Sequence, residues 1–103
     1  MRLVGERTRE LLTIITEASL ESALLRELDR MGVHGYTITD ARGKGSRGVR
    51  SANWEASGNI RIEIVCDATT ADAVTAFLTD HYYKDYAMIL FRTKVEVQRP
   101  QKF

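Results

Sequence analysis

The sequence is poor in cysteine, in excess charge and in long apolar runs, and each shortage excludes a class of protein. Its single cysteine, Cys66, cannot form an intramolecular disulfide framework or a multi-cysteine zinc site. The 15 Lys and Arg residues nearly balance the 14 Asp and Glu residues, so the net charge of +1 identifies no partner. No apolar run approaches the roughly 20 residues that span a bilayer, and the N-terminal segment lacks the apolar core of a signal peptide. We therefore expect a cytoplasmic protein.

The remaining composition is that of an ordinary globular chain. Hydrophobic residues make up 44% of the 103 residues and charged residues 28%, which argues against disorder. This length predicts a single domain over residues 1–103. A chain of this size buries only roughly 60–68% of its unfolded surface, so oligomerisation would support it.

The first half of the chain predicts a strand, a helix and a second strand. Residues 11–16 form a continuous β-rich apolar run, which is typical of a strand covered on both faces. Ser19 is expected to cap a helix, and Gly32 stands where a helix end favours glycine. Residues 35–41 then alternate between apolar and polar side chains and predict the second strand.

The second half repeats this order. Residues 59–66 alternate with isoleucines inward and predict the third strand. Thr69 and Asp72 have the spacing of a helix-capping pair, and a final strand is expected over about residues 86–97. The side chains expected on the inner face of that strand are Ile89, Phe91, Val95 and Val97, with Met88 and Leu90 facing the other way.

Two βαβ units joined by a long loop predict a ferredoxin-like α+β fold. The expected architecture is βαββαβ, a four-stranded antiparallel sheet with two helices on one face. The other face of the sheet carries apolar side chains that no further element of the chain can cover. We expect either a second copy of the chain on that face or a partly wet, moderately apolar surface.

The long loop at residues 42–58 has the composition of an anion-binding segment. No acidic residue occurs between Asp40 and Glu55. Glycines let backbone N–H groups converge on one oxygen cluster, and arginines add planar forks that suit phosphate. The alternative is a solvated basic hairpin loop. The cations and glycines concerned are Arg42, Gly43, Lys44, Gly45, Arg47, Gly48 and Arg50.

Outside the glycines and cations of this loop, few residues are candidates for a binding, metal or catalytic site. Trp54, within the loop, is either an anchor for a partner protein or a side chain folded back on the surface. His34 and His81 have no third ligand at metal-binding spacing, so we expect no metal site. No nucleophile, base and orienting group can be assembled, and we expect no catalytic residues and no enzymatic activity.

The loop and its flanking strands carry a family resemblance. The run from Gly35 to Ser51, GYTITDARGKGSRGVRS, followed by NIRIEIV at 59–65 and DYAMI at 85–89, resembles the PII-like signalling proteins. The similarity extends over roughly residues 8–97 and is most specific at 43–50. The nearest branch is the carbon-regulatory type, that of SbtB and the carboxysome-associated PII-like proteins. The resemblance implies a ferredoxin-like homotrimer in which the loop between strands two and three is the T-loop.

The resemblance also implies a ligand and a partner. An adenine nucleotide would bind in each of three clefts between subunits, and the T-loop would contact a regulated protein, such as a bicarbonate transporter or a carboxysome component, with Trp54 as a candidate anchor. Bicarbonate is a second candidate ligand; no cofactor or nucleic acid is implied. By position in the motif, the phosphate-binding residues would be Gly43, Gly45, Ser46, Arg47 and Arg50, and the base-binding residues Tyr86, Ala87 and Met88.

Two departures from the PII pattern narrow these expectations. Residues 81–87 contain no glycine, where PII proteins carry a glycine-rich second phosphate loop. This favours ADP or AMP over ATP with 2-oxoglutarate, and cyclic AMP and ATP remain further candidates. The T-loop has no tyrosine, so uridylylation there is excluded.

Two other classes share the βαββαβ order. RNA-recognition domains need aromatic side chains on the exposed face of the central strands, whereas the third strand offers Arg61, Glu63 and Val65 there. Small hydrolases of the acylphosphatase type carry a glycine loop after the first strand, and residues 16–20 contain no glycine. RNA binding and such a hydrolase remain the alternative functions.

Overall fold

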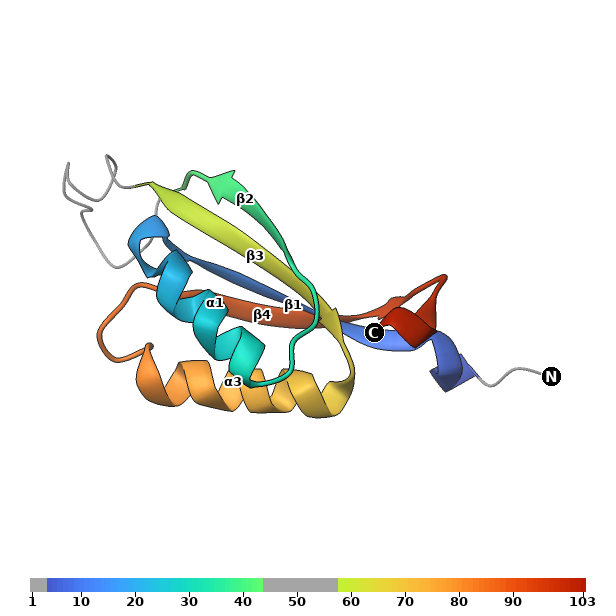
Figure 1. Cartoon of the computed structure of the whole chain (residues 1–103). Coiled ribbons are helices and arrows are strands. Elements are labelled where there is room, and N and C mark those ends of the chain that lie inside the picture. The colour runs from blue at the N-terminus through green and yellow to red at the C-terminus, as the bar shows by residue number, and fades with distance from the viewer. Residues whose placement is uncertain (1–3, 44–57) are drawn as a thin grey trace.

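A computed structural model describes residues 4–43 and 58–103. It contains one four-stranded antiparallel sheet with strand order β2-β3-β1-β4, and both helices cover the same face of that sheet (Figure 1). The ferredoxin-like βαββαβ architecture is thereby confirmed. The elements are β1 (Thr8–Glu17), α1 (Glu21–Arg30), β2 (Thr37–Ala41), β3 (Asn59–Cys66), α3 (Ala68–His81) and β4 (Ile89–Glu96), with 3₁₀ turns at Val4–Arg7, Ala18–Leu20 and Pro100–Lys102.

The core lies between the helices and the central strands. β1 and β3 place Leu12 opposite Ile64 and Ile14 opposite Ile62, and all four side chains are fully buried. The inward isoleucines expected from the alternation in β3 are therefore confirmed. The helices close this layer with Leu24, Leu28, Ala71, Val74 and Leu78.

The end of α1 is explained by one glycine. Gly32 adopts a φ of +83°, a conformation that residues with a Cβ rarely take. Its N–H donates to the carbonyl of Asp29, and the next N–H, of Val33, donates to Leu28. This is the Schellman arrangement, and it confirms Gly32 as the helix stop.

Both helix starts differ from the expectation. Ser19 lies inside the 3₁₀ turn before α1, and its Oγ donates to Glu17 Oε1 at 2.9 Å instead of capping the helix. α3 is capped by Asp67, whose Oδ1 accepts from Thr70 N–H at 2.8 Å. The predicted cap at Thr69 is therefore two residues too late, because the carboxylate of Asp67 reaches the free N–H groups first.

The inner face predicted for the last strand is wrong. β4 begins at Ile89, and its register places Ile89 opposite Ile15 and Phe91 opposite Thr13, on the face away from the helices. Ile89 is 53% exposed and Phe91 47%. Leu90 and the buried Met88 pack against the core instead. Both alternating sets of positions in this segment carry apolar residues, so alternation alone could not show which set faces the helices. Val95 belongs to the same outward-facing set as Ile89 and Phe91, and Val97 lies beyond the last residue of β4.

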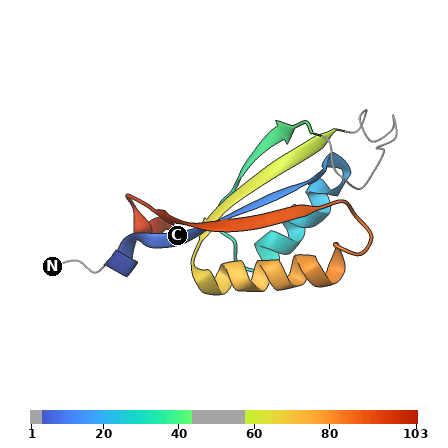
Figure 2. The ribbon, with the colours of Figure 1, turned by 180° about the vertical axis from the view of Figure 1, so that it is seen from behind.

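The sheet face opposite the helices is the open face. Both helices lie on one side of the sheet in the two opposite views of Figures 1 and 2. No described residue covers the other side. Its apolar members are only partly buried or exposed: Leu11, Ile15, Val65, Ile89 and Phe91. The uncovered apolar face expected from the sequence is thus present, with Ile89 and Phe91 on it in place of the predicted Met88 and Leu90.

Candidate functional site

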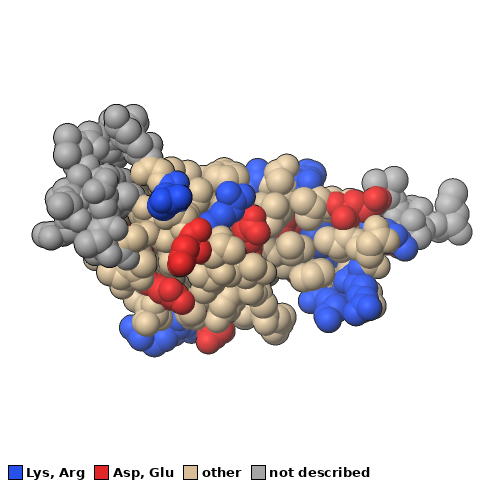
Figure 3. Space-filling model, turned by 90° about the horizontal axis from the view of Figure 1, so that it is seen from above, with Lys and Arg blue, Asp and Glu red and all other residues tan. Residues whose placement is uncertain are grey.

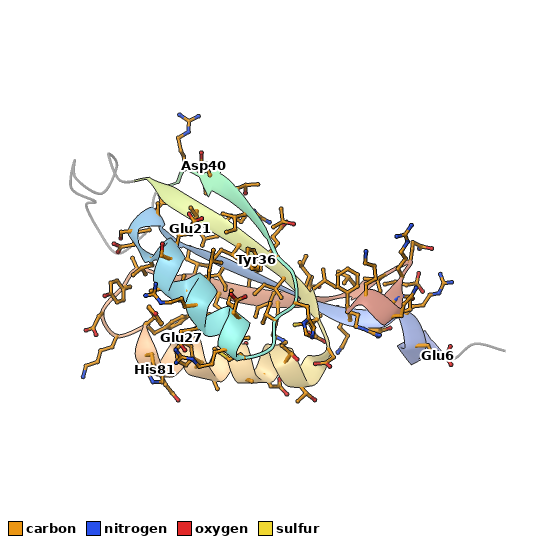
Figure 4. The ribbon with its side chains drawn as sticks, viewed as in Figure 1. Glu6, Glu21, Glu27, Tyr36, Asp40 and His81 are labelled. Carbon is orange, nitrogen blue, oxygen red and sulfur yellow. The ribbon has the colours of Figure 1, made fainter. Side chains whose placement is uncertain are left out.

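The sheet has two functionally distinct ends. At the first, here called the loop end, the register aligns Ala41 of β2 with Asn59 of β3, and Ile15 of β1 with Ile89 of β4. The connection at 42–58 and the segment at 82–88 therefore leave the sheet on the same side. Figure 4 shows Asp40 and His81, which precede these two connections, at that end. The structure thus brings Gly43, at the start of the long loop, and the candidate base-binding segment to one end of the sheet.

The base of the long loop is held by backbone contacts. Gly58, directly before β3, adopts a φ of +75°, and its carbonyl accepts from Ala18 N–H at 3.1 Å. Gly43, which follows β2, is exposed. The other candidates in the loop lie outside the described residues: Gly45, Ser46, Arg47, Arg50 and Trp54.

Asn59 is a polar residue at the loop base that the sequence reasoning missed. It is only 7% exposed, and its Oδ1 accepts no hydrogen bond from the described part of the chain. A buried acceptor without a donor costs about 1–3 kcal/mol. A ligand or a water that donates to this oxygen would recover that cost.

The segment Tyr86–Met88 contributes unequally to a base site. The Met88 side chain belongs to the core and is 8% exposed, while its N–H donates to the Tyr86 carbonyl at 3.0 Å. Tyr86 and Ala87 are partly buried. The Tyr86 ring and main-chain groups can therefore contact a base, whereas the thioether of Met88 cannot.

Tyr86 ends a chain of aromatic contacts that joins this segment to α3. Its ring centroid lies 5.6 Å from that of Tyr82, which lies 6.0 Å from Phe77. Phe77 also stacks on His81 at 4.4 Å, and His81 Nδ1 lies 3.0 Å from the Phe77 carbonyl oxygen. Burial, with the negative charge of Glu27, raises the pKa of Tyr82, which stays neutral. These contacts support the segment from one side.

The opposite end of the sheet holds a pocket of about 460 Å³. Three stretches far apart in sequence form it: the turn after α1, the β3–α3 junction and the C-terminal residues. No local pattern marked it in the sequence, because its walls meet only in the folded chain. Its lining residues are Gly32, Val33, His34, Gly35, Val65, Cys66, Asp67, Thr70, Gln101, Lys102 and Phe103.

The pocket combines apolar walls with a few polar groups. Val33, Val65 and the Phe103 ring are apolar, while Lys102 supplies a cation and His34 an imidazole. Burial raises the pKa of the Cys66 thiol to about 11, so it stays protonated and unreactive at neutral pH. Among the described residues no cluster of His, Cys, Asp and Glu could hold a metal ion. Asp67 adds a carboxylate to the lining, so the pocket offers a charge of each sign.

A buried carboxylate fastens the same end of the sheet to α3. Glu10 is 5% exposed and accepts from Arg92 Nε at 3.1 Å and from Lys94 Nζ at 2.9 Å. Arg92 also reaches Asp72 of α3 at 2.8 Å. The hydrogen bonds from Lys94 and Arg92 lower the pKa of Glu10 despite its burial. This network ties β1, β4 and α3 together.

The strand order, the helices on a single face and the long connection between β2 and β3 define a ferredoxin-like domain with a loop-borne candidate site. A comparison with protein families identifies the family. The family model "Nitrogen regulatory protein P-II" matches residues 9–102. The chain belongs to the P-II family, and it is a PII-like signalling protein.

Two solved proteins show how close the likeness is. A PII-like signalling protein from Thermus thermophilus is 42% identical, covers 93% of this chain and 95% of its own, and superimposes with a TM-score of 0.79. CPII, a nitrogen regulatory PII-like protein from Thiomonas intermedia, is 27% identical over 93% of this chain and 94% of its own, with a TM-score of 0.80. That CPII structure contains ADP and bicarbonate. Another CPII structure, 26% identical over 90% of this chain and 96% of its own with a TM-score of 0.76, contains ADP, AMP and bicarbonate.

None of the described helices is long and apolar enough to cross a membrane.

Proposed function

We propose that this chain is a cytoplasmic, single-domain sensor of adenine nucleotides that assembles as a homotrimer and binds ADP or AMP in the clefts between subunits. It signals through the T-loop at residues 42–58 and has no catalytic role. The observation that carries the proposal is the likeness to CPII, which spans 93% of this chain and whose solved structure contains ADP and bicarbonate. The cation- and glycine-rich loop, at the same end of the sheet as Tyr86, supports it independently.

The phosphate groups are assigned to the T-loop. Backbone N–H groups around the loop glycines and the guanidinium groups of the loop arginines supply donors for several phosphate oxygens. The first of these residues, Gly43, is exposed and follows β2 after a single intervening residue, Arg42. The residues proposed for the phosphates are Gly43, Gly45, Ser46, Arg47 and Arg50.

The base is assigned to the segment after α3. The partly buried Tyr86 ring and the main chain of Ala87 and Met88 form a supported surface at the same end of the sheet. The pocket lies at the opposite end of the sheet, so one subunit cannot bring both this base-binding surface and its pocket into contact with the same mononucleotide. A cleft between subunits, with the loop end of one facing the pocket of the next, would use both.

The signalling partner is proposed to belong to inorganic-carbon metabolism. CPII structures contain bicarbonate beside the nucleotides, and we propose bicarbonate as a second ligand here and the carbon-regulatory branch as this chain's place in the family. A nucleotide that contacts the loop shifts its conformational population. The loop, with Trp54 as its anchor, would then bind a bicarbonate transporter or a carboxysome component according to the ligand present.

Nucleic-acid binding has less support. Basic and acidic side chains are interspersed on the face shown in Figure 3, whereas binding to a phosphate backbone favours a continuous basic stripe. On the open face of β3, Arg61 is paired with Glu63 at 3.1 Å. We therefore keep the nucleotide sensor as the single proposal.

Calorimetric titration tests this function directly. ADP, AMP, ATP and cyclic AMP are titrated into the protein, each with and without bicarbonate. We expect binding of ADP and AMP, strengthened by bicarbonate. Replacing Arg47 and Arg50 together with alanine should weaken ADP binding by about 100-fold or more, because each loss leaves phosphate oxygens without a charged donor.

The control is a second pair of arginines with the same change in charge. Arg26 and Arg30 lie on the exposed side of α1, and Arg30 pairs with Glu27 only at the surface. Their double alanine variant should bind ADP as the wild type does. If the wild-type protein binds none of the four nucleotides at millimolar concentration, the proposed function is wrong.

A further inference from the structure

The C-terminal residues fold back on the molecule and form one wall of the pocket. After β4, the chain turns into the 3₁₀ turn Pro100–Lys102, where Lys102 N–H donates to Arg99 and Phe103 N–H donates to Pro100, both at 3.1 Å. We call Pro100–Phe103 the tail. Three of the pocket-lining residues come from it, Gln101, Lys102 and Phe103.

The tail gains little stability from burial. Pro100 is half-buried, while the other three side chains are exposed, and Phe103 remains 45% exposed. Hydrophobic packing scales with the apolar area removed from water. Polar contacts must therefore fix its position.

Those contacts come from one residue of β1. Arg9 donates through Nη2 to the Pro100 carbonyl at 2.8 Å and through Nε to the main-chain oxygen of Phe103 at 3.3 Å. Its Nη1 donates to the carbonyls of Thr8 at 2.9 Å and Glu6 at 3.3 Å. Arg9 thus spans both ends of the tail while its own guanidinium is held against the start of β1.

We propose that Arg9 is a latch that positions the tail as a wall of the pocket and thereby sets the affinity of the pocket for its ligand. The part that concerns affinity rests on the proposed nucleotide function. The pocket has its third wall only when the tail is closed. Affinity falls with the fraction of molecules in the binding-competent state, so a loosened latch weakens binding without removing any residue from the pocket.

Three variants isolate the latch. Arg9→Gln removes the guanidinium fork, and Arg9→Lys keeps the charge but loses the planar set of donors. Arg7→Gln is the matched control, because Arg7 donates an exposed side-chain bond to Gln98 Oε1 at 3.2 Å, upstream of the tail. Thermal unfolding of each variant shows whether the fold is intact.

Hydrogen exchange measures the latch without any ligand. The amides of Lys102 and Phe103 report tail closure, because they donate to the carbonyls of Arg99 and Pro100 and so hold the 3₁₀ turn of the tail. We expect Arg9→Gln and Arg9→Lys to speed their exchange by about tenfold, while amides in β3 and the Arg7→Gln protein stay at the wild-type rate. Wild-type exchange at both tail amides in Arg9→Gln would overturn the latch, whether or not the protein binds a nucleotide.

Calorimetry with ADP then measures the consequence for binding. Arg9→Gln should weaken ADP binding by about three- to tenfold, and Arg7→Gln should not change it. A double-mutant cycle with Phe103→Ala separates this route from a general structural effect. If Arg9 acts through the tail, Arg9→Gln has a smaller effect in the Phe103→Ala protein, whose tail has lost one of its three pocket-lining side chains, and the two changes are not additive.

Each result supports or contradicts either the proposed function or the latch. Failure of the wild type to bind ADP contradicts the proposed function, and the exchange rates then decide the latch alone. ADP binding that is unaffected by Arg9→Gln, or fully additive losses in the cycle, would refute the link between latch and affinity while leaving the nucleotide sensor intact.

Discussion

At the scale of single residues, Glu10 is a buried charge that links three elements of the fold. It is nearly buried, yet it remains ionised because Arg92 and Lys94 each donate to one of its oxygens. A buried carboxylate without such donors would be strongly disfavoured. Its value to the fold therefore depends on its protonation state.

We expect this dependence to appear in the pH profile of stability. The folded-state pKa of Glu10 is lowered by its hydrogen bonds, so its contribution is present above the unfolded-state pKa, which is about 4.3. It is lost as the pH falls from there through the lower folded-state value. Melting temperatures of the wild type and of Glu10→Gln should differ at pH 7, with the wild type higher, and converge at acid pH. A gap that stays constant down to about pH 2 would show that ionisation is irrelevant.

The residues that could be predicted from the sequence are those whose signal is local. Gly32 was recognised as a helix stop because the conformation it adopts is a property of the residue itself. Arg9 and the pocket could not be predicted, since Arg9 contacts residues some 90 positions away and only the folded sheet brings them together. For the proposed phosphate site, composition predicts a role for the cations and glycines of the loop, whereas their spatial arrangement has no local signature.

At the scale of elements, the end of α1 shows how one backbone conformation sets the path of the next segment. The Schellman bonds of Gly32 and Val33 turn the chain from the helix into the segment that lines the pocket and leads to β2. The same turn therefore ends α1 and forms one wall of the pocket.

Gly32→Ala should destabilise the protein by about 1 kcal/mol or somewhat more, because alanine is strained at positive φ. The melting temperature should fall by about 4–8 °C for each kcal/mol. Gly35→Ala is the control, since an added Cβ meets no atom within 4 Å in either position and, of the two, only Gly32 has a positive φ. Equal melting temperatures for the two variants would contradict this account.

Strand prediction succeeded where one face was apolar and failed where both were. β3 runs over the predicted residues, because isoleucines alternate with charged side chains. β4 has apolar residues in both phases, so the choice of inward face depended on its register with β1, which the sequence of the strand does not contain.

At the scale of the whole molecule, the open face is an apolar surface that the described residues of one chain do not cover. Ile89 and Phe91, both about half exposed, add to the partly buried apolar side chains of β1 and β3. A second and third copy of the chain that cover this face fit the proposed homotrimer.

We expect Phe91→Lys to dissociate that assembly, because association would have to bury an unpaired ammonium group. Light scattering after size exclusion should give the wild type a mass three times the chain's 11.7 kDa and the variant the mass of one chain. Tyr83→Lys is the matched control: Tyr83 is 37% exposed but lies outside the sheet, so its variant should remain trimeric. A folded Phe91→Lys trimer would exclude this face as the interface.

The described part of the chain extends over 55 Å along its longest axis, with the ends of β2 and β3 that flank the long loop at one pole and the C-terminal turn Pro100–Lys102 at the other (Figure 2). In a closed ring of three, every subunit would serve two clefts, one with each pole. A ligand bound in one cleft would then contact two subunits, each of which also forms one of the other two clefts. Occupancy of one cleft would then be coupled to that of the other two through the subunits they share, without any internal hinge.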